Sequence, residues 1–350
     1  MINSTREPDG SAGGEGFDLV GAQMLAGFPQ LCATLGATPE DLLSAVGIPC
    51  GTQRPARVTY RQFVDLLASA SNRLGCLDFG MRLAIHQAGT DLYGPLGTIM
   101  RSARTFGEAL QYVVELAHVH SPAARITRHA IPGREGIVFS HEIIVGDFAQ
   151  QEQAMEHILL AGHLGAMVLT SGRSRGRQIL LRHRPVSSPA VYRRNFGCEV
   201  LFDQPVDGIV FSKQDLANTI VGQDRSVASK AIANVLAHWP VQAPPIEAAT
   251  RAAILRLIPV GLATNTHVAA ELGMNTRALH RRLRESGTTF QKIKDQVRCE
   301  LVRYYVRHTE LSFLWITGKL DFAEQAVFTR FCRRHLGVSP TELRAQAAGR

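Results

Sequence analysis

Apolar residues recur at two different spacings along this chain. Over residues 58–86, 104–119 and 151–170 they return every three or four positions, which predicts helices with one buried face. Five shorter apolar runs predict strands, the first two joined by a hairpin turn at residues 132–135: residues 124–131, 136–144, 178–182, 199–202 and 208–211. Because these helices and strands do not alternate regularly, the pattern predicts an α+β domain.

A proline-rich segment divides the chain. Residues 238–245 hold three prolines in eight positions, and proline both removes helix donors and restrains the residue before it. We therefore predict an α+β domain at 18–237, a linker at 238–246 and an all-α domain at 247–350. Residues 1–17, rich in Gly, Ser and acidic side chains, are predicted to be a disordered tail.

The segment after Pro245 follows a helical pattern almost throughout. We predict a first helix at 250–260 and a short second helix at 267–272. Asn265 or Thr266 is expected to cap the second helix, since both side chains can accept a hydrogen bond from a free backbone N–H.

Residues 268–274, V-A-A-E-L-G-M, have the pattern of a helix-turn-helix. A small residue lets two helices cross closely, a leucine enters the core, and Gly273 supplies the turn. A third helix capped by Asn275 or Thr276 is predicted to run to about residue 285. One such match is a weak signal.

The same pattern returns 48 residues later as I-T-G-K-L-D-F at 316–322, followed by a helix at 323–336. Between the copies, residues 290–308 carry a single apolar stripe and predict a helix about 28 Å long. Two helices fixed to such a rod could enter successive major grooves, which are about 34 Å apart. The duplication strongly favours DNA binding.

Positive charge is concentrated at one end of the chain. Residues 246–350 hold 17 Lys and Arg against 9 Asp and Glu, whereas residues 1–245 hold 21 of each. Such asymmetry indicates a basic module that meets a polyanion, attached to a neutral module with another role.

Composition excludes several classes of protein. The hydrophobic content of 45% is that of a globular protein, and no apolar run is long enough to predict a membrane span or a secretory signal. The six cysteines form no C-x-x-C motif, which argues against a disulfide framework or zinc site. We expect a cytoplasmic protein with no membrane partner.

No cofactor, metal ion or catalytic site is predicted. Two histidine pairs, His118 with His120 and His157 with His163, lack the helical spacing of paired ligands and are expected to be incidental. The glycines at 10–16 are not flanked like a phosphate loop, and no G-x-S-x-G occurs. A triad of Ser, His and Asp converges only in space, so the sequence does not decide that question.

Three motifs of the C-terminal part resemble the DNA-binding domain of AraC-type transcription regulators. They are L-G-M-N-T-R-A-L-H-R-R-L at 272–283, F-T-R-F-C-R-R-H-L-G-V-S-P at 328–340 and T-E-L-R at 341–344. The G-V-S-P ending with a nearby arginine is particularly characteristic of the family.

Looser motifs make the N-terminal part similar to the arabinose-binding-like sensor domain of one branch of that family. They are D-F-G-M-R-L at 78–83, G-P-L-G at 94–97, T-F-G-E-A-L at 105–110 and F-G-C-E-V-L-F at 196–202. The resemblance covers about residues 19–346. It implies an α+β sensor domain followed by an all-α DNA-binding domain, with two helix-turn-helix motifs joined by a long helix.

The resemblance implies which side chains meet DNA. Arginine can hold guanine and glutamine can hold adenine through paired hydrogen bonds, whereas contacts to phosphates position the protein without specifying sequence. Arg282 is either a structural residue or a further contact, and Glu324 lies near the second set. The expected base-edge residues are Arg277, His280, Arg281, Gln325 and Arg330, and the expected phosphate contacts are Arg284, Thr329, Arg333 and Arg334.

The second motif departs from the family pattern at three places. Thr317 stands where the family has Ala, Asp321 where it has Gly, and Phe331-Cys332 where a small residue precedes Phe. Aspartate tolerates a left-handed turn better than most residues, so the fold is expected to survive. Whether the core of the second motif shifts is left open.

A small organic effector is what the resemblance implies for the N-terminal domain. Weak candidates for binding it are Arg128, His129 and His141 on the predicted hairpin, where alternation places Arg128 and His129 on opposite faces. The competing interpretation is a solvated strand surface. Double-stranded DNA is the other expected partner, with RNA polymerase and a second copy of the chain as further candidates.

Three hypotheses follow from the sequence. The first is an effector-responsive transcription regulator that reads a promoter in two successive major grooves. The alternative is a sequence-indifferent nucleic-acid-binding or architectural protein, which shares the same dependence on phosphate contacts. A third is an enzyme or carrier whose activity lies in the N-terminal half.

Overall fold

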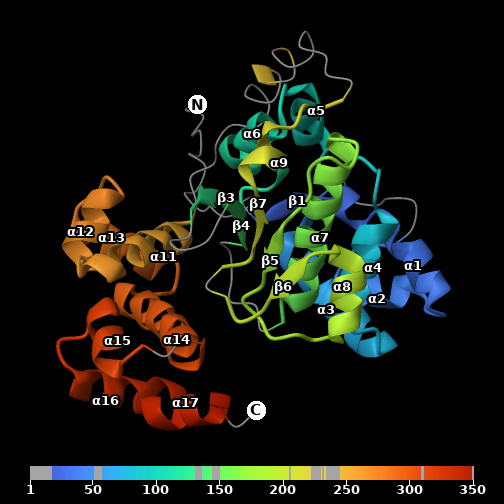
Figure 1. The fold of residues 1–350 in the computed structure, drawn as a ribbon. Coiled ribbons are helices and arrows are strands. Elements are labelled where there is room, and N and C mark those ends of the chain that lie inside the picture. The colour runs from blue at the N-terminus through green and yellow to red at the C-terminus, as the bar shows by residue number, and fades with distance from the viewer. Residues whose placement is uncertain are drawn as a thin grey trace, which may run out of the picture. The chain divides into compact units, whose positions relative to one another are not determined.

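The computed structural model describes residues 18–50, 57–130, 136–143, 150–204, 206–221, 230, 232–233, 245–308 and 311–348. The chain divides into two compact units, Met1–Ala243 and Pro244–Arg350 (Figure 1). The expected tail at 1–17, the linker residues 238–244 and the expected hairpin turn at 132–135 lie outside the described residues.

One five-stranded sheet, in the order β3-β4-β7-β5-β6, runs through the N-terminal unit. β5 and β6 are parallel, and the other neighbouring strands are antiparallel. Every residue of β7 is buried, which indicates that both faces of the sheet centre are covered. The strands lie where the apolar runs predict them, with small differences at their ends: Ala124–His129 (β3), Ile137–Ile143 (β4), Gln178–Leu180 (β5), Glu199–Leu201 (β6) and Gly208–Phe211 (β7).

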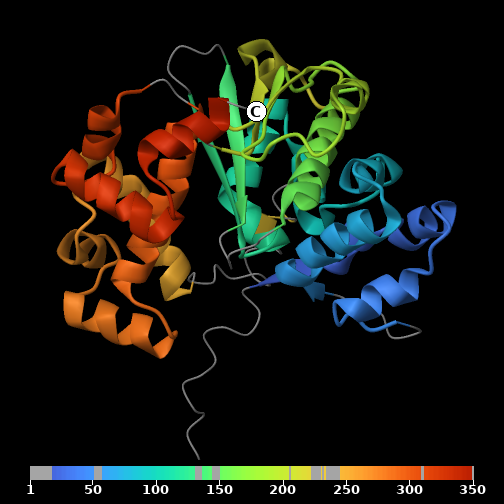
Figure 2. The ribbon, with the colours of Figure 1, turned by 90° about the horizontal axis from the view of Figure 1, so that it is seen from below.

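Helices cover the sheet, and β1 (Leu19–Gly21) and β2 (Arg57–Thr59) pair in a separate two-stranded ribbon. α1 and α2 pack on α4 and α3 and lie away from the sheet (Figure 2). The described helices are η1 (Ala22–Leu25), α1 (Phe28–Thr34), α2 (Pro39–Ala45), α3 (Tyr60–Leu74), α4 (Phe79–His86), α5 (Gly94–Ser102), α6 (Phe106–His120), α7 (Glu152–Leu169), α8 (Pro189–Phe196) and α9 (Lys213–Ala217).

The helical pattern over residues 58–86 belongs to two helices, not one. Gly75 takes a left-handed conformation with φ of 59° and ends α3, and α4 begins at Phe79. A capping box of Thr59 and Gln62 fixes the start of α3, where the Thr59 hydroxyl accepts a hydrogen bond from the Gln62 N–H at 3.0 Å.

α7 is the central helix of this unit, since it packs against β7 as well as α3 and α4. The crossing with α4 depends on Gly80, because a Cβ there would stand 2.0 Å from the carbonyl oxygen of Gln153. In the same place the Gly80 N–H donates to Oε1 of Gln153 at 2.8 Å. Only glycine allows this approach of the two backbones.

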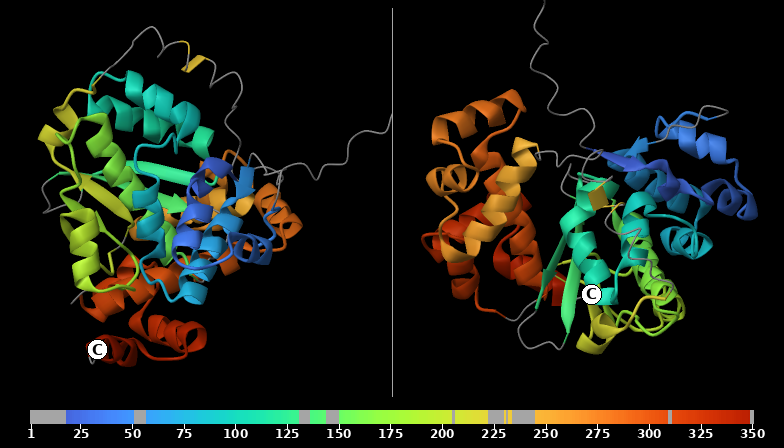
Figure 3. Two further views of the ribbon diagram at one scale, coloured as in Figure 1. Left: turned by 90° about the vertical axis from the view of Figure 1, so that its right-hand side faces the viewer. Right: turned by 90° about the horizontal axis from the view of Figure 1, so that it is seen from above.

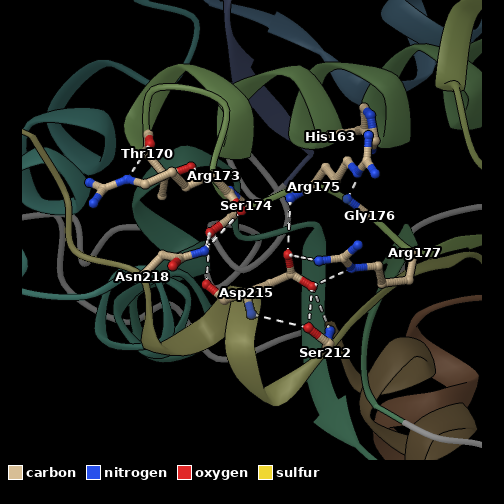
Figure 4. Close-up of polar contacts among 10 residues, drawn as sticks. All are labelled: His163, Thr170, Arg173, Ser174, Arg175, Gly176, Arg177, Ser212, Asp215 and Asn218. Atoms are coloured by element: carbon tan, nitrogen blue, oxygen red, sulfur yellow. Dashed lines mark hydrogen bonds and ion pairs between the residues drawn. The ribbon is translucent and has the colours of Figure 1, made fainter.

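A buried carboxylate fastens the C-terminal end of α7 to the sheet and α9 (Figure 4). Asp215 is fully buried and accepts hydrogen bonds from Nε and Nη2 of Arg177 at 2.7 and 2.8 Å. It also accepts from the Ser212 N–H at 2.9 Å, and its own carbonyl accepts from the Ser174 hydroxyl. Burial opposes ionisation, but these donors hold the pKa of Asp215 below its ordinary value.

We expect Asp215→Ala to lower the free energy of unfolding of the N-terminal unit by about 2–4 kcal/mol, since the bonds from Arg177 and Ser212 to this buried carboxylate are all lost. Urea unfolding of the full chain measures this loss. The matched control is Lys213→Ala, which removes an exposed side chain from the same helix and should leave stability nearly unchanged. Equal stability of the two variants would contradict the role given to this carboxylate.

The C-terminal unit is all α, as expected. α14 spans the predicted residues and packs against α11, α15, α16 and α17, with the two helix-turn-helix pairs on either side of it (Figure 1). The described helices are α11 (Ile246–Leu257), η2 (Ile258–Val260), α12 (Asn265–Glu271), α13 (Thr276–Glu285), α14 (Phe290–His308), α15 (Phe313–Lys319), α16 (Gln325–Leu336) and α17 (Pro340–Ala348).

Three local predictions for this unit are wrong. The first helix starts at Ile246 and its last residues form the 3-10 turn η2. The cap of α12 is Thr264 rather than Asn265 or Thr266, because its side chain accepts from the His267 N–H. α16 begins two residues later than expected, since Glu324 is still extended with φ of −156° and ψ of 161°.

Among the described helices, none combines the length and the apolar character that a membrane span requires.

Candidate nucleic-acid interface and internal cavity

The two helix-turn-helix units repeat each other at the level of single hydrogen bonds. Around the first turn, the N–H groups of Gly273 and Met274 donate to the carbonyls of Ala270 and Ala269 at 3.0 and 2.9 Å. The residues 48 positions later make the same two bonds at 3.2 and 3.1 Å. The caps repeat as well, because Thr264 and Ser312 each accept from the N–H three residues ahead. The predicted duplication is therefore confirmed in its geometry.

Asp321 occupies the turn position of the second unit without glycine. It adopts φ of 57°, close to the 67° of Gly273. Its carboxylate accepts from Nζ of Lys294 at 2.7 Å and lies 3.5 Å from Nη2 of Arg298, which also stacks on the ring of Phe322. Two cations of α14 thus hold this turn, so they are structural rather than DNA contacts.

The other departures from the family pattern also fit inside the fold. Thr317 is buried and its hydroxyl donates to the carbonyl of Phe313 at 2.6 Å, which removes the cost of burying it. Cys332 is fully buried in the core of this unit, as is Phe328. Larger residues are accommodated here by hydrogen bonding and packing.

One face of α13 carries the predicted base-reading side chains of the first unit. Arg277, His280, Arg281 and Arg284 are exposed, and they line a single hollow in the surface together with Asn275. Their spacing of three and four residues places them on one side of the helix, opposite the buried Leu279 and Leu283. Two of these side chains are already oriented: Nε2 of His280 lies 2.9 Å from Oδ1 of Asn265, and Nε of Arg281 lies 3.7 Å from Oε1 of Glu285.

α16 presents the corresponding face of the second unit. Gln325 and Arg330 are exposed, as are Arg333 and Arg334 nearer the end of the helix. Thr329 is less available than expected, because its hydroxyl donates to the carbonyl of Gln325 at 2.9 Å. This leaves only the acceptor side of the Thr329 oxygen for a partner.

The N-terminal unit contains a cavity of about 350 Å³, open on one side, between the sheet and the surrounding helices. Its walls come mainly from α5 and α6, which pack side by side (Figure 3), and from α7, β4 and β7. Most of the lining is apolar, with aromatic rings at Phe106, Phe139 and Phe211. A cavity of this size and character is typical of a small-molecule site.

A few uncharged polar groups converge on this cavity. The Tyr60 hydroxyl and Nε2 of His141 share a hydrogen bond of 3.1 Å, and burial lowers the pKa of His141 to about 3. Burial also lowers the pKa of His120 to about 4, and Nδ1 of that ring has no hydrogen-bond partner among the described residues. Gln87 is fully engaged, since its amide donates to two backbone carbonyls and its oxygen lies 2.6 Å from Nε2 of His157.

Of the three effector residues suggested by the sequence, His141 alone lines the cavity. Arg128 pairs with Phe139 and so shares its face, but it is exposed near the end of β3. His129 pairs with Val138 and points to the other face. Tyr60 and His120 were not predicted. One sequence feature could have identified His120. It falls on the buried helical stripe of α6, where a polar residue is unusual.

Among the residues that the structure describes, no group of three His, Cys, Asp or Glu side chains could hold a metal ion. His157 bonds Gln87, and Nδ1 of His163 accepts from the Gly176 N–H at 3.1 Å, so both rings serve the interior of the fold.

Comparison with known proteins assigns both units. Residues 36–220, more than half of the chain, match the family described as the arabinose-binding domain of AraC transcription regulators, N-terminal. Residues 268–346 match a helix-turn-helix domain family.

Curated relatives match over most of the chain. The HTH-type transcriptional regulator VirS of Mycobacterium tuberculosis is 29% identical over 332 residues, covering 93% of this chain and 96% of that protein. The ornithine utilization regulator of Pseudomonas aeruginosa is 24% identical over 322 residues, covering 90% and 93%. The transcriptional activator RhaS of Escherichia fergusonii is 32% identical over 78 residues, which are 22% of this chain and 28% of that protein. The chain belongs to the AraC family of transcription regulators, with an N-terminal arabinose-binding domain followed by a helix-turn-helix domain of the AraC type.

Proposed function

We propose that this regulator binds a specific promoter sequence by inserting α13 and α16 into successive major grooves, and that a small molecule in the N-terminal cavity modulates it. The observation that carries the first part is the duplication itself. Two helix-turn-helix units with the same hydrogen-bond pattern flank one helix, and each exposes arginines on its second helix. A helix of 19 residues is about 28 Å long, which suits the spacing of adjacent grooves.

The proposed base-edge residues are Arg277, His280, Arg281, Gln325 and Arg330, which are exposed on α13 and α16. The cavity supports the second part of the proposal, because it is apolar and contains polar groups that could orient a ligand. RNA polymerase and a second copy of the chain are further proposed partners, and a regulator of this kind would act in the cytoplasm where promoters lie. We also propose residues 18–237 and 247–350 as the two functional domains.

Selection of a binding site from a random DNA pool tests the proposal against the alternative of sequence-indifferent binding. We expect the selected duplex to bind at least about 10³-fold more tightly than an unrelated duplex at the same salt concentration. A ratio near one would favour an architectural protein and would refute base reading by these helices.

Arg334→Ala is expected to weaken binding to selected and unrelated duplexes alike, because a phosphate contact carries no sequence information. The slope of log K against log salt should become shallower by about 0.9 if one phosphate contact is lost. Arg73→Ala removes an exposed arginine of α3 and serves as the control. A loss confined to the selected duplex would mean that Arg334 reads a base instead.

A further inference from the structure

The walls of the cavity in the N-terminal unit carry almost no fixed charge. Of its lining residues in the described chain, Arg101 is the one with a permanent charge. That side chain is half exposed and its guanidinium reaches outward to Asp91 at 3.5 Å and to Thr98 at 3.2 Å. A charged ligand inside would lose its water without gaining a counterion, which is strongly unfavourable.

The polar groups in the cavity remain neutral at physiological pH. Burial keeps the rings of His120 and His141 unprotonated, and burial raises the pKa of Tyr93 to about 12, so that its hydroxyl also stays uncharged. Tyr60 and His141 satisfy each other through their hydrogen bond, whereas Nδ1 of His120 has no partner in the described part of the chain. That nitrogen is closed off from solvent, so a ligand would meet the His120 ring at the part of it that lines the cavity.

The helix α7 keeps the cavity open at Gly165. Glycine inside a helix is less favourable than alanine by about 0.5–1 kcal/mol, so its presence at this wall needs a reason. A Cβ at Gly165 would stand 3.8 Å from Cε2 of Tyr93, an ordinary contact, which means that alanine fits but a longer side chain would enter the cavity.

We propose that the cavity binds an uncharged, largely apolar organic molecule with one hydroxyl or carbonyl group, and that this group hydrogen-bonds the ring of His120, which lines the cavity. This inference rests on the proposed role of the cavity as the effector site, and it adds the chemical class of the effector. Organic acids and amines of the same size would meet no charged partner in the described walls other than Arg101, which is half exposed and already paired with Asp91.

Displacement of the uncharged fluorescent probe N-phenyl-1-naphthylamine from the full chain at pH 7.5 tests the ligand class. The competitors are 1-octanol, octanoate and octylammonium, which share one chain length and differ in charge. We expect 1-octanol to displace the probe at a concentration at least about 10-fold lower than either ion. Equal or stronger competition by an ion, or failure of the probe to bind the wild-type chain, would overturn the proposal.

A pair of variants locates the site. Gly165→Met should weaken probe binding by about 10-fold or more, because its side chain fills the space, while Gly165→Ala should change it by less than about 2-fold. Circular dichroism verifies that both variants are folded. Wild-type probe binding by a folded Gly165→Met would show that the probe lies elsewhere and would overturn the assignment to this cavity.

His120→Leu tests the hydrogen bond. It should weaken competition by 1-octanol by about 2- to 10-fold and leave competition by 1-chlorooctane, which has no hydroxyl, unchanged. Equal effects on both competitors would remove His120 from the proposal. All three measurements are made without DNA, so their failure leaves promoter reading intact, and a failure of promoter reading leaves the ligand preference intact.

Discussion

Acidification from about pH 6.5 to pH 4.5 is expected to unfold the N-terminal unit while the C-terminal unit stays folded. The reason is a set of buried histidines that the fold keeps neutral. His157 is fully buried and burial lowers its pKa to about 3, while His163 is 2% exposed with its pKa lowered to about 4 by the same cause. Both hydrogen-bond neighbours inside the unit, so neither can move to water without opening the fold.

The direction of the effect follows from proton uptake. Between the ordinary histidine pKa near 6.5 and the lowered values, the unfolded chain binds protons that the folded chain does not, so the free energy of unfolding falls as pH falls. At pH 4.5 His157 and His163 together remove about 5 kcal/mol, and His120 and His141 act in the same direction. That loss is comparable with the whole stability of many domains.

Glu156 acts with the opposite sign but over a different range. This carboxyl is fully buried and accepts from the Tyr192 hydroxyl at 2.5 Å, and burial raises its pKa to about 8. The folded chain therefore holds an extra proton between about pH 4.5 and 8, so this group stabilises the fold as the pH falls through that range. We expect Glu156 to reduce the loss of unfolding free energy on acidification without reversing it, because four histidines act in the opposite direction.

Urea titrations of the full chain at several pH values, followed by pulsed hydrogen exchange and mass spectrometry, measure each unit separately. Peptides from α7 and α14 report on the N-terminal and C-terminal units. His157→Gln should reduce the pH dependence of unfolding of the N-terminal unit by up to about 1.4 kcal/mol per pH unit, which corresponds to one proton. The control His86→Gln, at an exposed histidine of α4, should leave it unchanged. Full protection of α7 at pH 4 would contradict the prediction.

The C-terminal unit could be predicted closely from the sequence because its signals are local. The long helix α14 was found at its observed bounds from one apolar stripe, and Gly273 marked the first turn. The stripe is broader than a single row, since Val302 and Val306 are fully buried in its second half while the neighbouring Leu301 and Tyr305 are partly buried against the same core. α14 packs against α11, α15, α16 and α17 and therefore buries more than one face.

The cavity could not be predicted, because no local pattern marks it. Tyr60 and His141 are 81 positions apart and come within hydrogen-bond distance only in the folded unit. The hairpin histidines are candidate ligand contacts because of their chemistry, but the strand register places His129 on the sheet face opposite the cavity. The stability of the turn at Asp321 could not be predicted from local sequence for a similar reason. Asp321 replaces the glycine of the family pattern, and its stabilising partners Lys294 and Arg298 lie on another helix.

Arg281→Ala and Arg330→Ala together are expected to weaken binding to the selected duplex by about 2–6 kcal/mol, or roughly 30-fold to 10⁴-fold. Each arginine is exposed on the second helix of its own helix-turn-helix unit, so the two losses should be nearly additive. Each has only a weak intramolecular partner, Glu285 at 3.7 Å and Glu324 at 4.0 Å, which would not compete seriously with guanine.

The matched control is Arg281→Lys, which keeps the charge but loses the planar fork that holds guanine through two hydrogen bonds. It should bind unrelated duplexes like the wild-type chain and lose selectivity at one base pair of the selected site. Titrations with every single-base variant of that site measure this selectivity. Unchanged affinity and selectivity in Arg281→Ala would remove that residue from the reading surface, and an equal loss on all sequences would make it a phosphate contact.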